Sequence, residues 1–377
     1  MKTLAAVGFV LGLTIIVACG GPGSPGPASD EGGTIDTLRI SVVDTIGVMM
    51  GDSSYVFGNV TDATRTPDGE IYVLDGLRCR LSVYSPEGIF QRSVGRKGSG
   101  PGEYQYPKSF ALMSDGSVVI CDWGGISVTH LTPELEFDTL ITGYRHIAPD
   151  RLVPFPDGSY VGMTLRHSVE NGQPVGSTYV ARFDRSTQPE LVYCGYPMTF
   201  SLGDDGDLNV HTVLLRWDTG PDGSVYVAIG CDSVWAFTGY GPEGDTLVTV
   251  FKPWERVAKT EEELEEGLLH ESLSTGRESG TSVNRDRRYE NVPRYHNAIG
   301  SIDVDDQGRI WVGRGWTDVP TFDVYSPRGN LLFVATVPAL EDVDGLSYCF
   351  DNGYLAFDEQ PEDYPKVYLL RMGRRTD

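Results

Sequence analysis

A short phrase that recurs six times constrains this chain more than any other feature. It reads PDGEIYVLD at 67–75, SDGSVVICD at 114–122, PDGSYVGM at 156–163, PDGSVYVAI at 221–229, DQGRIWVG at 306–313 and DNGYLAF at 351–357. Each copy joins a tight turn that ends in glycine to an alternating strand rich in valine, isoleucine and tyrosine. Glycine supplies the positive φ of the turn, and β-branched and aromatic residues suit a half-buried sheet. The repeat therefore predicts an all-β chain built from one unit.

The spacing of the turn glycines sets the size of that unit. Most neighbouring copies lie roughly 45 residues apart, which is the length of a four-stranded propeller blade. The first unit shows the expected strands near Gly58–Arg65, Glu70–Asp75, Arg80–Tyr84 and Ile89–Val94. The six copies predict six blades.

The last repeat is short by one strand. From Gly345 to Asp377 there is room for three strands, whereas the alternating segment Thr37–Val43 has no blade of its own. A ring hides its strand edges when the two chain ends share a blade. We therefore predict a six-bladed β-propeller over residues 34–377, with the N-terminal strand closing the last blade.

The widest gap between repeats contains an insertion, residues 252–296. Its first half is predicted to be helical, since Thr260 and Glu263 form a capping box. Its second half is basic and aromatic. The insertion is interpreted either as a surface excursion or as a lid over the channel. In the lid hypothesis the contributing side chains are Arg285, Arg287, Arg288, Tyr289, Arg294 and Tyr295.

The N-terminus carries targeting signals. An apolar run follows Lys2 and ends in Ile16-Val17-Ala18-Cys19-Gly20. That ending resembles the lipobox of bacterial lipoproteins, which implies a signal peptide over 1–18 and lipidation of Cys19. Residues 19–33 are rich in Gly, Pro and Ser and are predicted to form a flexible tether. We expect a lipid-anchored protein of the cell envelope, on the outer membrane or the periplasmic face of a Gram-negative host.

Charge and cysteine content exclude several classes of function. The formal net charge of −23 argues against nucleic acid as a partner, and it leaves the lipidated Cys19 as the expected link to a membrane. An odd number of cysteines remains after Cys19, and no CxxC pair is present, so neither a zinc site nor a full disulfide framework is indicated. No cofactor is implied. The expected partner is a small molecule or an envelope protein.

The segment GRKGSGPGEYQYP at 95–107, followed by a strand, a DG turn and a second strand, is typical of one group of proteins. It resembles the NHL-type or TolB-like six-bladed propellers, and the bacterial six-bladed β-propeller lipoproteins in particular. The segment VPRYHNAIGSIDVDDQGRIWV at 292–312 fits the same group. The resemblance implies the fold and an envelope location. It brings no single shared activity.

The fold suggests where a ligand would bind. In a propeller the inner strands start, and the second strands end, on one face, which we call the mouth face. The polar residues inferred to lie there are Asn59, Lys108, Arg151, His211, Asn297, Asp344, Asp122 and Arg314. Such a mixture of charge and imidazole around a channel is consistent with a small-ligand site. The alternative for each residue is that it caps a strand.

Two classes of function remain open. The leading hypothesis is a non-catalytic module that binds a ligand or a partner protein through the mouth face. The alternative is a metal-dependent hydrolase or lyase of the lactonase type, in which Asn59, Asn297 and Asp344 would supply oxygen ligands. Lys108 and Arg151 would repel a cation from such a site. No motif for a nucleophilic hydrolase is present.

Overall fold

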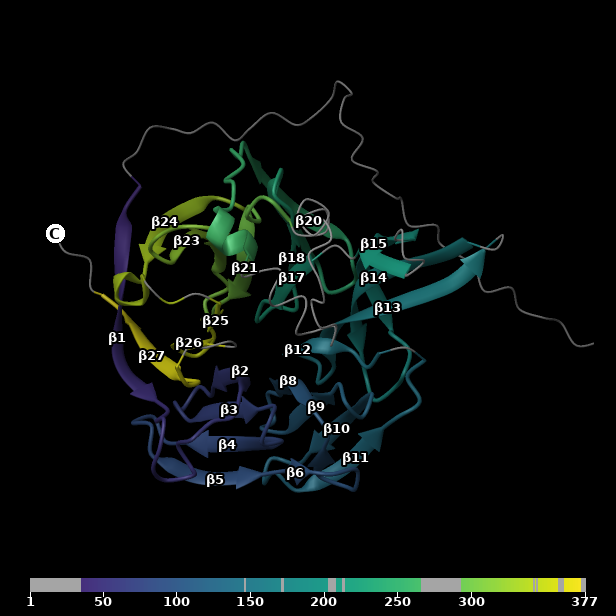
Figure 1. The fold of residues 1–377 in the computed structure, drawn as a ribbon, viewed down its shortest axis with the longest axis vertical. Helices are drawn as coiled ribbons and strands as arrows, with labels where there is room; N and C mark the ends of the chain where they lie inside the picture. Colours follow the sequence, from purple (N-terminus) through teal and green to yellow (C-terminus); the bar gives the residue numbers. More distant parts are fainter. Residues whose placement is uncertain are drawn as a thin grey trace, which may run out of the picture. The chain divides into compact units, whose positions relative to one another are not determined.

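The structure is a computed structural model that describes residues 35–145, 147–170, 173–202, 208–211, 214–265, 293–341, 343, 345–358 and 363–373. Blades of antiparallel strands surround a common centre (Figure 1), and the last two blades belong to one eight-stranded sheet joined through β1. The predictions for residues 1–33, including the lipidation of Cys19, lie outside the described residues. The described helices include none long and apolar enough to cross a membrane.

The first two blades follow the predicted pattern of four consecutive strands. Blade 1 contains β2 (Val60–Arg65), β3 (Ile71–Asp75), β4 (Arg80–Tyr84) and β5 (Phe90–Val94). Blade 2 contains β8 (Pro107–Leu112), β9 (Val118–Asp122), β10 (Ser127–Leu131) and β11 (Phe137–Ile141). The strands predicted for blade 1 are confirmed to within two residues at each end.

A short ladder connects these two blades. It pairs β6 (Arg96–Lys97) with β7 (Glu103–Tyr104) in parallel. The carboxylate of Glu103 accepts hydrogen bonds from the backbone N–H groups of Ser99 (3.1 Å) and Gly100 (2.9 Å) and pairs with Arg96. The glycine-rich segment is thus a structural turn between blades.

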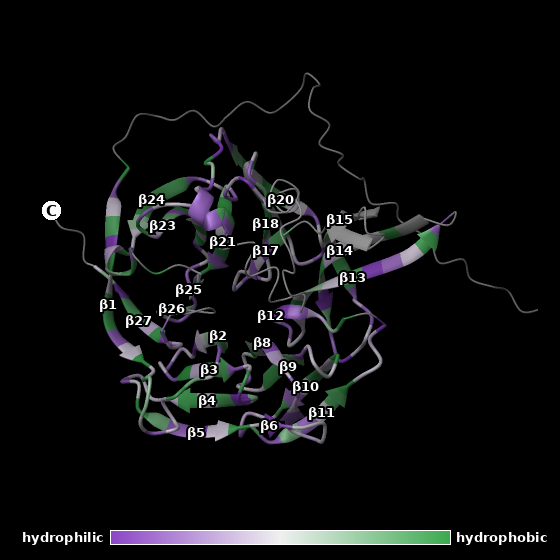
Figure 2. Ribbon diagram, viewed as in Figure 1, coloured by the Kyte–Doolittle hydropathy of each residue, from purple (hydrophilic) through white to green (hydrophobic). Residues whose placement is uncertain are grey.

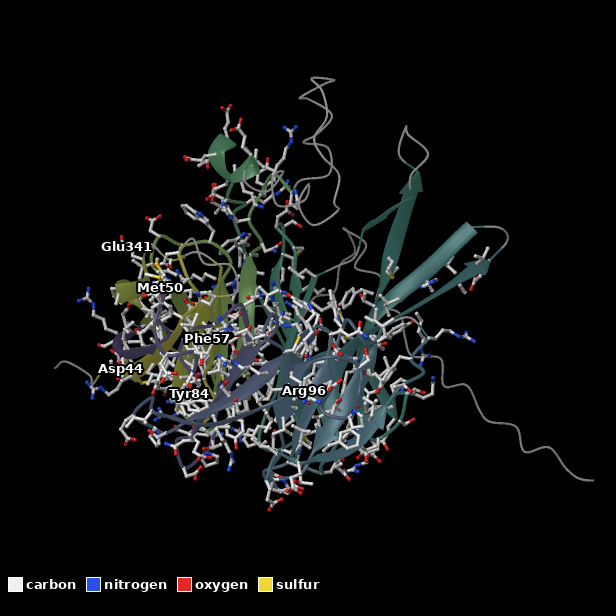
Figure 3. The ribbon with its side chains drawn as sticks, turned by 60° about the horizontal axis from the view of Figure 1, so that its bottom comes forward. Asp44, Met50, Phe57, Tyr84, Arg96 and Glu341 are labelled. Carbon is white, nitrogen blue, oxygen red and sulfur yellow. The ribbon has the colours of Figure 1, made fainter. Side chains whose placement is uncertain are left out.

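Blade 3 is longer than the others. Its strands are β12 (Asp150–Pro154), β13 (Tyr160–Glu170), β14 (Gln173–Phe183), β15 (Leu191–Leu202) and β16 (Leu208–His211). The far ends of β13 and β14 reach beyond the body of the ring, in teal at the upper right of Figure 3. The extra strand β16 shifts the start of the next blade. Blade 4 contains β17 (Leu214–Thr219), β18 (Val225–Gly230), β19 (Trp235–Tyr240) and β20 (Thr246–Lys252).

Blades 5 and 6 share the N-terminal strand. Blade 5 contains β21 (Ile299–Val304), β22 (Ile310–Arg314), β23 (Thr321–Tyr325) and β24 (Leu331–Thr336), and a 3₁₀ turn, η1 (Pro338–Leu340), follows it. Blade 6 contains β25 (Leu346–Cys349), β26 (Tyr354–Asp358) and β27 (Val367–Met372).

The predicted closure of the ring is confirmed. The strand β1 (Thr37–Ile46) is the outer strand of blade 6 and pairs antiparallel with β27, from Ile40 opposite Met372 to Ile46 opposite Val367. Its first three residues also pair in parallel with β24. The strand runs past the predicted end at Val43 to Ile46.

The apolar core lies between neighbouring blades. Trp311 of blade 5 is fully buried and stacks on Phe350 of blade 6, with ring centroids 4.3 Å apart. Trp235 of blade 4 packs against Tyr325 of blade 5. Figure 2 shows the pattern in blade 1, where the buried β4 is green and the outer β5 carries purple. The blades are therefore held face to face by large side chains, and the inner strands are left to line the centre.

Candidate functional site

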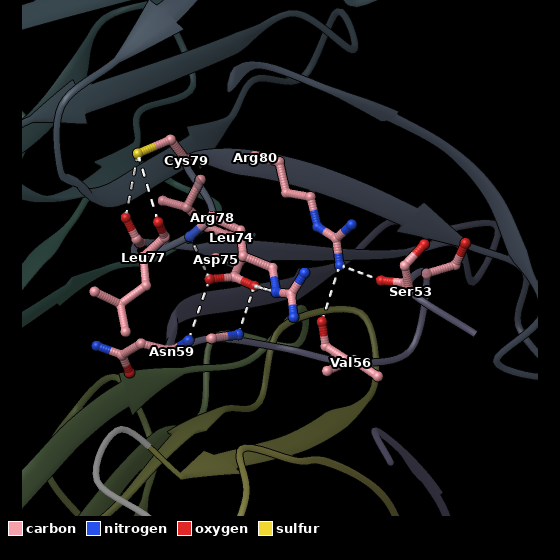
Figure 4. A network of polar contacts seen from close by, with 12 residues as sticks. Ser53, Val56, Asn59, Leu74, Asp75, Leu77, Arg78, Cys79 and Arg80 are labelled. Carbon is pink, nitrogen blue, oxygen red and sulfur yellow. Dashed lines mark hydrogen bonds and ion pairs between the residues drawn. The ribbon is translucent and has the colours of Figure 1, made fainter. Parts of the chain in front are cut away.

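Two of the predicted residues, Asn59 and Asp122, take part in a latch at the ends of the second strands. In blade 1, Asp75 accepts hydrogen bonds from the N–H groups of Gly58 (2.8 Å), Asn59 (3.1 Å) and Arg78 (2.9 Å), as Figure 4 shows. In blade 2, Asp122 accepts hydrogen bonds from Gln105 (2.9 Å) and Tyr106 (2.7 Å). Each carboxylate ties the start of an inner strand to the end of the second strand.

Arg314 lies in an ion cluster between blades 4 and 5. Its guanidinium group donates to Asp323 on β23 at 2.8 Å, and Lys252 on β20 pairs with the same carboxylate. Burial opposes ionisation of Asp323, but the hydrogen bonds from Arg314 and Lys252 lower its pKa. The ammonium group of Lys252 also lies 3.9 Å from the ring centroid of Trp235. Arg314 therefore holds Asp323 within blade 5, and Lys252 provides the contact with blade 4.

Of three further predicted residues, two do not line the central cavity and one lies outside the described residues. Asn297 precedes β21 and does not line the central cavity. His211 lies in β16, where its backbone pairs with Thr199 of β15. It is therefore not at the start of an inner strand, as predicted, and Leu214 occupies that position. Asp344 lies outside the described residues.

The remaining two predicted residues, Lys108 and Arg151, line a cavity of about 1350 Å³ at the centre of the ring. The inner strands of all six blades contribute to its wall. Aligning those strands on their turn glycines orders the wall by depth. Lys108, Arg151 and Arg216 lie toward the mouth face, Asp218 and Asp303 share a deeper level, and Asp306 and Asp351 lie near the opposite face. The channel is therefore richer in bases toward the mouth face, where Asp62 and Asp150 also lie, and acidic at the deeper levels; we call these its basic end and its acidic end.

Many polar side chains of this wall connect one inner strand to the next. Asp62 accepts a hydrogen bond from the N–H of Phe110 at 2.9 Å, and the Oγ of Ser109 accepts one from Leu152 at 3.2 Å. Such bonds continue between blades 4 and 5. Nε of Arg216 donates to the carbonyl of Gly300 at 2.8 Å, and Asp218 accepts from Val304 at 2.6 Å. These groups have an architectural role.

Arg151 is different. Its φ is +51°, a left-handed conformation that is uncommon for residues other than glycine, and a β-bulge interrupts β12 at this point. The side chain is exposed to the channel, and its guanidinium carbon lies 5.5 Å from the ring centroid of the buried Trp217. Within the described ranges no carboxylate forms an ion pair with it. Strained residues of this kind concentrate at functional sites.

At the acidic end of the channel, the pKa values of three carboxyl groups are raised. Burial raises the pKa of Asp218 well above its ordinary value, and the neighbouring Asp303 adds to the shift. Burial also raises the pKa of Asp303 to about 7, against the opposing charge of Arg151. For Asp351, burial and the charge of Asp306 raise the pKa to about 6. Since like charges close together disfavour ionisation, this end of the channel can hold protons near neutral pH.

The described stem of the insertion packs on the mouth face over blades 4 and 5. The capping box forms as predicted, with Thr260 N–H donating to Glu263 at 2.6 Å, and residues 261–265 are helical. Glu263 pairs with His296 at 3.2 Å, and the His296 ring lies 5.4 Å from that of Trp316. Figure 3 shows this helix, in green, rising above the ring.

The structure describes two of the residues named in the lid hypothesis, Arg294 and Tyr295. Arg294 is exposed, and Tyr295 stacks under Arg256 at 3.7 Å. Neither residue lines the cavity. Arg285, Arg287, Arg288 and Tyr289 lie outside the described residues.

The geometry gives no support to the lactonase interpretation. Within the described ranges no group of three or more His, Cys, Asp or Glu side chains is arranged to hold a metal ion. Asn59 and Asn297 do not line the cavity.

Comparisons with known proteins agree on the fold. Residues 54–128 match the model of a family described as a 6-bladed beta-propeller. A solved structure of a protein described as exported, from Bacteroides fragilis, is 11% identical, covers 90% of this chain and 99% of its own, and has a TM-score of 0.50. An inactive variant of virginiamycin B lyase from Staphylococcus aureus, solved with quinupristin, is 9% identical, covers 88% and 99%, and has a TM-score of 0.45. No curated protein matches the chain.

Sequence reasoning missed Arg216, Asp218 and Asp303. A signal for them was present, because aligning the repeats on their turn glycines places all three on the inner strands. The prediction selects residues at the ends of strands, whereas these three lie within the inner strands.

Proposed function

We propose that this protein is a ligand-binding propeller of the cell envelope that holds a small acidic ligand in the mouth half of its central channel. The observation that carries the proposal is Arg151. This arginine faces the cavity in a strained backbone conformation and stacks against Trp217. Arg314, by contrast, has an architectural role and forms an ion pair with the buried carboxylate of Asp323.

The chemistry of Arg151 suits a carboxylate. A guanidinium group offers paired N–H donors that match the two oxygens of a carboxylate, and that of Arg151 lies over the Trp217 ring, 5.5 Å from its centroid. Lys108 and Arg216 line the same end of the cavity and add positive potential there. A binding role needs no metal or nucleophile. No observation favours the lactonase alternative over it.

Ligand binding can be tested with simple carboxylates. We expect glutarate and citrate at millimolar concentration to raise the melting temperature of the native protein, because a ligand that binds the folded state stabilises it. Arg151→Gln should abolish the shift. The matched control is Arg328→Gln, which changes an exposed arginine in the turn after β23. Equal shifts for the native protein and Arg151→Gln, or no shift with any carboxylate, would contradict the proposal.

The envelope location rests on the lipobox at Ile16–Gly20 and on the tether that follows it. We expect Cys19→Ala, expressed in a bacterial host, to move the protein from the membrane fraction to the soluble fraction or to leave it as a precursor. Mass spectrometry of the native protein should find acyl chains on Cys19. An unmodified Cys19 in a protein that fractionates as soluble would refute the anchor without bearing on the channel.

A further inference from the structure

Most charged side chains of the inner strands are engaged within the ring. Asp62, Arg216 and Asp218 hold the neighbouring strand. Asp150 accepts from the N–H of Arg151 at 2.7 Å and from Ser109 at 3.3 Å. Arg65 donates to the carbonyl of Gly69 at 3.1 Å. These contacts account for the charged groups that build the channel.

Asp303 is an exception among the acids, as Arg151 is among the bases. Its Oδ2 atom is buried without a hydrogen-bond partner in the described part of the chain, although the Ser301 hydroxyl on the same strand lowers the pKa of this carboxyl group. A buried carboxylate oxygen without a donor is costly, so such a position calls for a proton or a ligand. Asp218 lies at the same level on the neighbouring inner strand, and the charge of Asp303 acts on it. The two carboxylates create a site for a positively charged donor.

The wall as a whole does not favour a purely anionic ligand. Nine carboxylate side chains and five basic ones line the cavity, so acidic groups predominate away from the basic end. An acid bound at Arg151 would therefore have its far end in a negative potential. A ligand with a positive charge at that far end would meet the opposite potential at both ends.

We infer that the channel binds a zwitterion, with a carboxylate at Arg151 and an ammonium group at Asp303 and Asp218. The inference rests on the proposed function and names its ligand class. Arg151 on β12 and Asp303 on β21 differ in depth by two residues along extended strands, an axial offset of roughly 7 Å, and blade 4 lies between their blades. The acid and the amine should therefore be separated by a chain at least as long as this offset, as in ω-amino acids. An ammonium fits better than a hydroxyl because it also neutralises the paired carboxylates.

The inference can be tested with three probes of one chain length: hexanoate, hexylamine and 6-aminohexanoate. Binding is measured by ligand-observed NMR and calorimetry on the native protein. We expect 6-aminohexanoate to bind about tenfold more tightly than hexanoate, as a charged hydrogen bond would provide. Asp303→Asn should reduce that preference to about twofold or less while hexanoate binds as before. Arg151→Gln should weaken both acids. Asp318→Asn, an exposed change, is the matched control.

The outcomes separate the two proposals. If hexanoate binds through Arg151 but the amine adds nothing, or if Asp303→Asn keeps the preference, the zwitterion is refuted and the acid site stands. If neither acid binds, or if Arg151→Gln binds both as the native protein does, the proposed function itself fails. Should Asp303→Asn not fold, the comparison of hexanoate with 6-aminohexanoate on the native protein decides the question alone.

Discussion

Asp122 lies on the second strand of blade 2 and Asp303 on the inner strand of blade 5, and the surroundings of the two carboxylates differ. Asp122, at the end of β9, is 3% exposed and accepts two short hydrogen bonds from backbone N–H groups. Asp303, on β21, faces the channel with a buried oxygen that has no partner within the described ranges. The carboxylate of Asp122 therefore stabilises the start of an inner strand. The carboxylate of Asp303 has an oxygen available to accept a hydrogen bond from a ligand.

The same contrast separates two arginines that the sequence placed together at the mouth. Arg314 is bound by Asp323, whereas Arg151 has a strained backbone and contacts an indole ring. A polar residue at a blade end is therefore informative about function only when its partners are known. The following experiments test whether this division between architectural and available charges is real.

The largest effect is expected at the architectural carboxylate. Asp122→Ala should lower the free energy of unfolding by about 2 kcal/mol, because two part-buried N–H groups lose a charged acceptor. Urea denaturation followed by circular dichroism measures the change. Asp318→Ala, at an exposed position, should stay within about 0.5 kcal/mol of the native protein. A loss below about 1 kcal/mol for Asp122→Ala would show that the latch does not hold the blade.

Removing the carboxylate of Asp303 should increase stability, in contrast to Asp122, and the size of the increase should depend on pH. A carboxyl group whose pKa is raised by folding stabilises the folded state when protonated. That contribution is fully present below the unfolded pKa of about 4 and is lost as the pH rises through the folded value of about 7. Stability should therefore fall between about pH 4 and pH 7, by roughly 1 kcal/mol for each unit of pKa shift.

Asp303→Asn removes this titration. The variant should show a flatter profile than the native protein and should be more stable than it at pH 8. Melting temperatures across the pH series provide the measurement. Asp351, whose pKa is raised to about 6, will leave part of the slope in place. A variant that is less stable than the native protein at every pH would place Asp303 among the architectural residues.

The smallest effect concerns the backbone of Arg151. At a φ of +51°, Arg151→Gly should be about 1 kcal/mol more stable than Arg151→Ala, because a side chain in the left-handed region is strained. Guanidinium denaturation of the two variants gives the difference. At Ser93, an exposed position in β5, the order should reverse, with alanine more stable than glycine. The same order at both positions would remove the case for stored strain.

The fold was largely predictable and the candidate site was not. The DG turns located every second strand, and the missing strand of the last repeat led to the correct closure by β1. Side-chain partners do not follow from a repeat, so Asp122 and Arg314 could not be separated from Arg151. His211 was misplaced for another reason. The extra strand β16 interrupts the period of the repeats, which shifts the start of the inner strand to Leu214.

The closure of the ring also sets an order of events in time. The strand β1 is synthesised before every blade strand, and its partner β27 is synthesised after all the other described strands. The seam therefore cannot form until β27 has been made, and its contacts join segments that are far apart in the sequence. Until then both strands expose edges that other chains could pair with. Blades 1 to 4 are made of local hairpins and can fold earlier, so the seam is the expected slow step in folding.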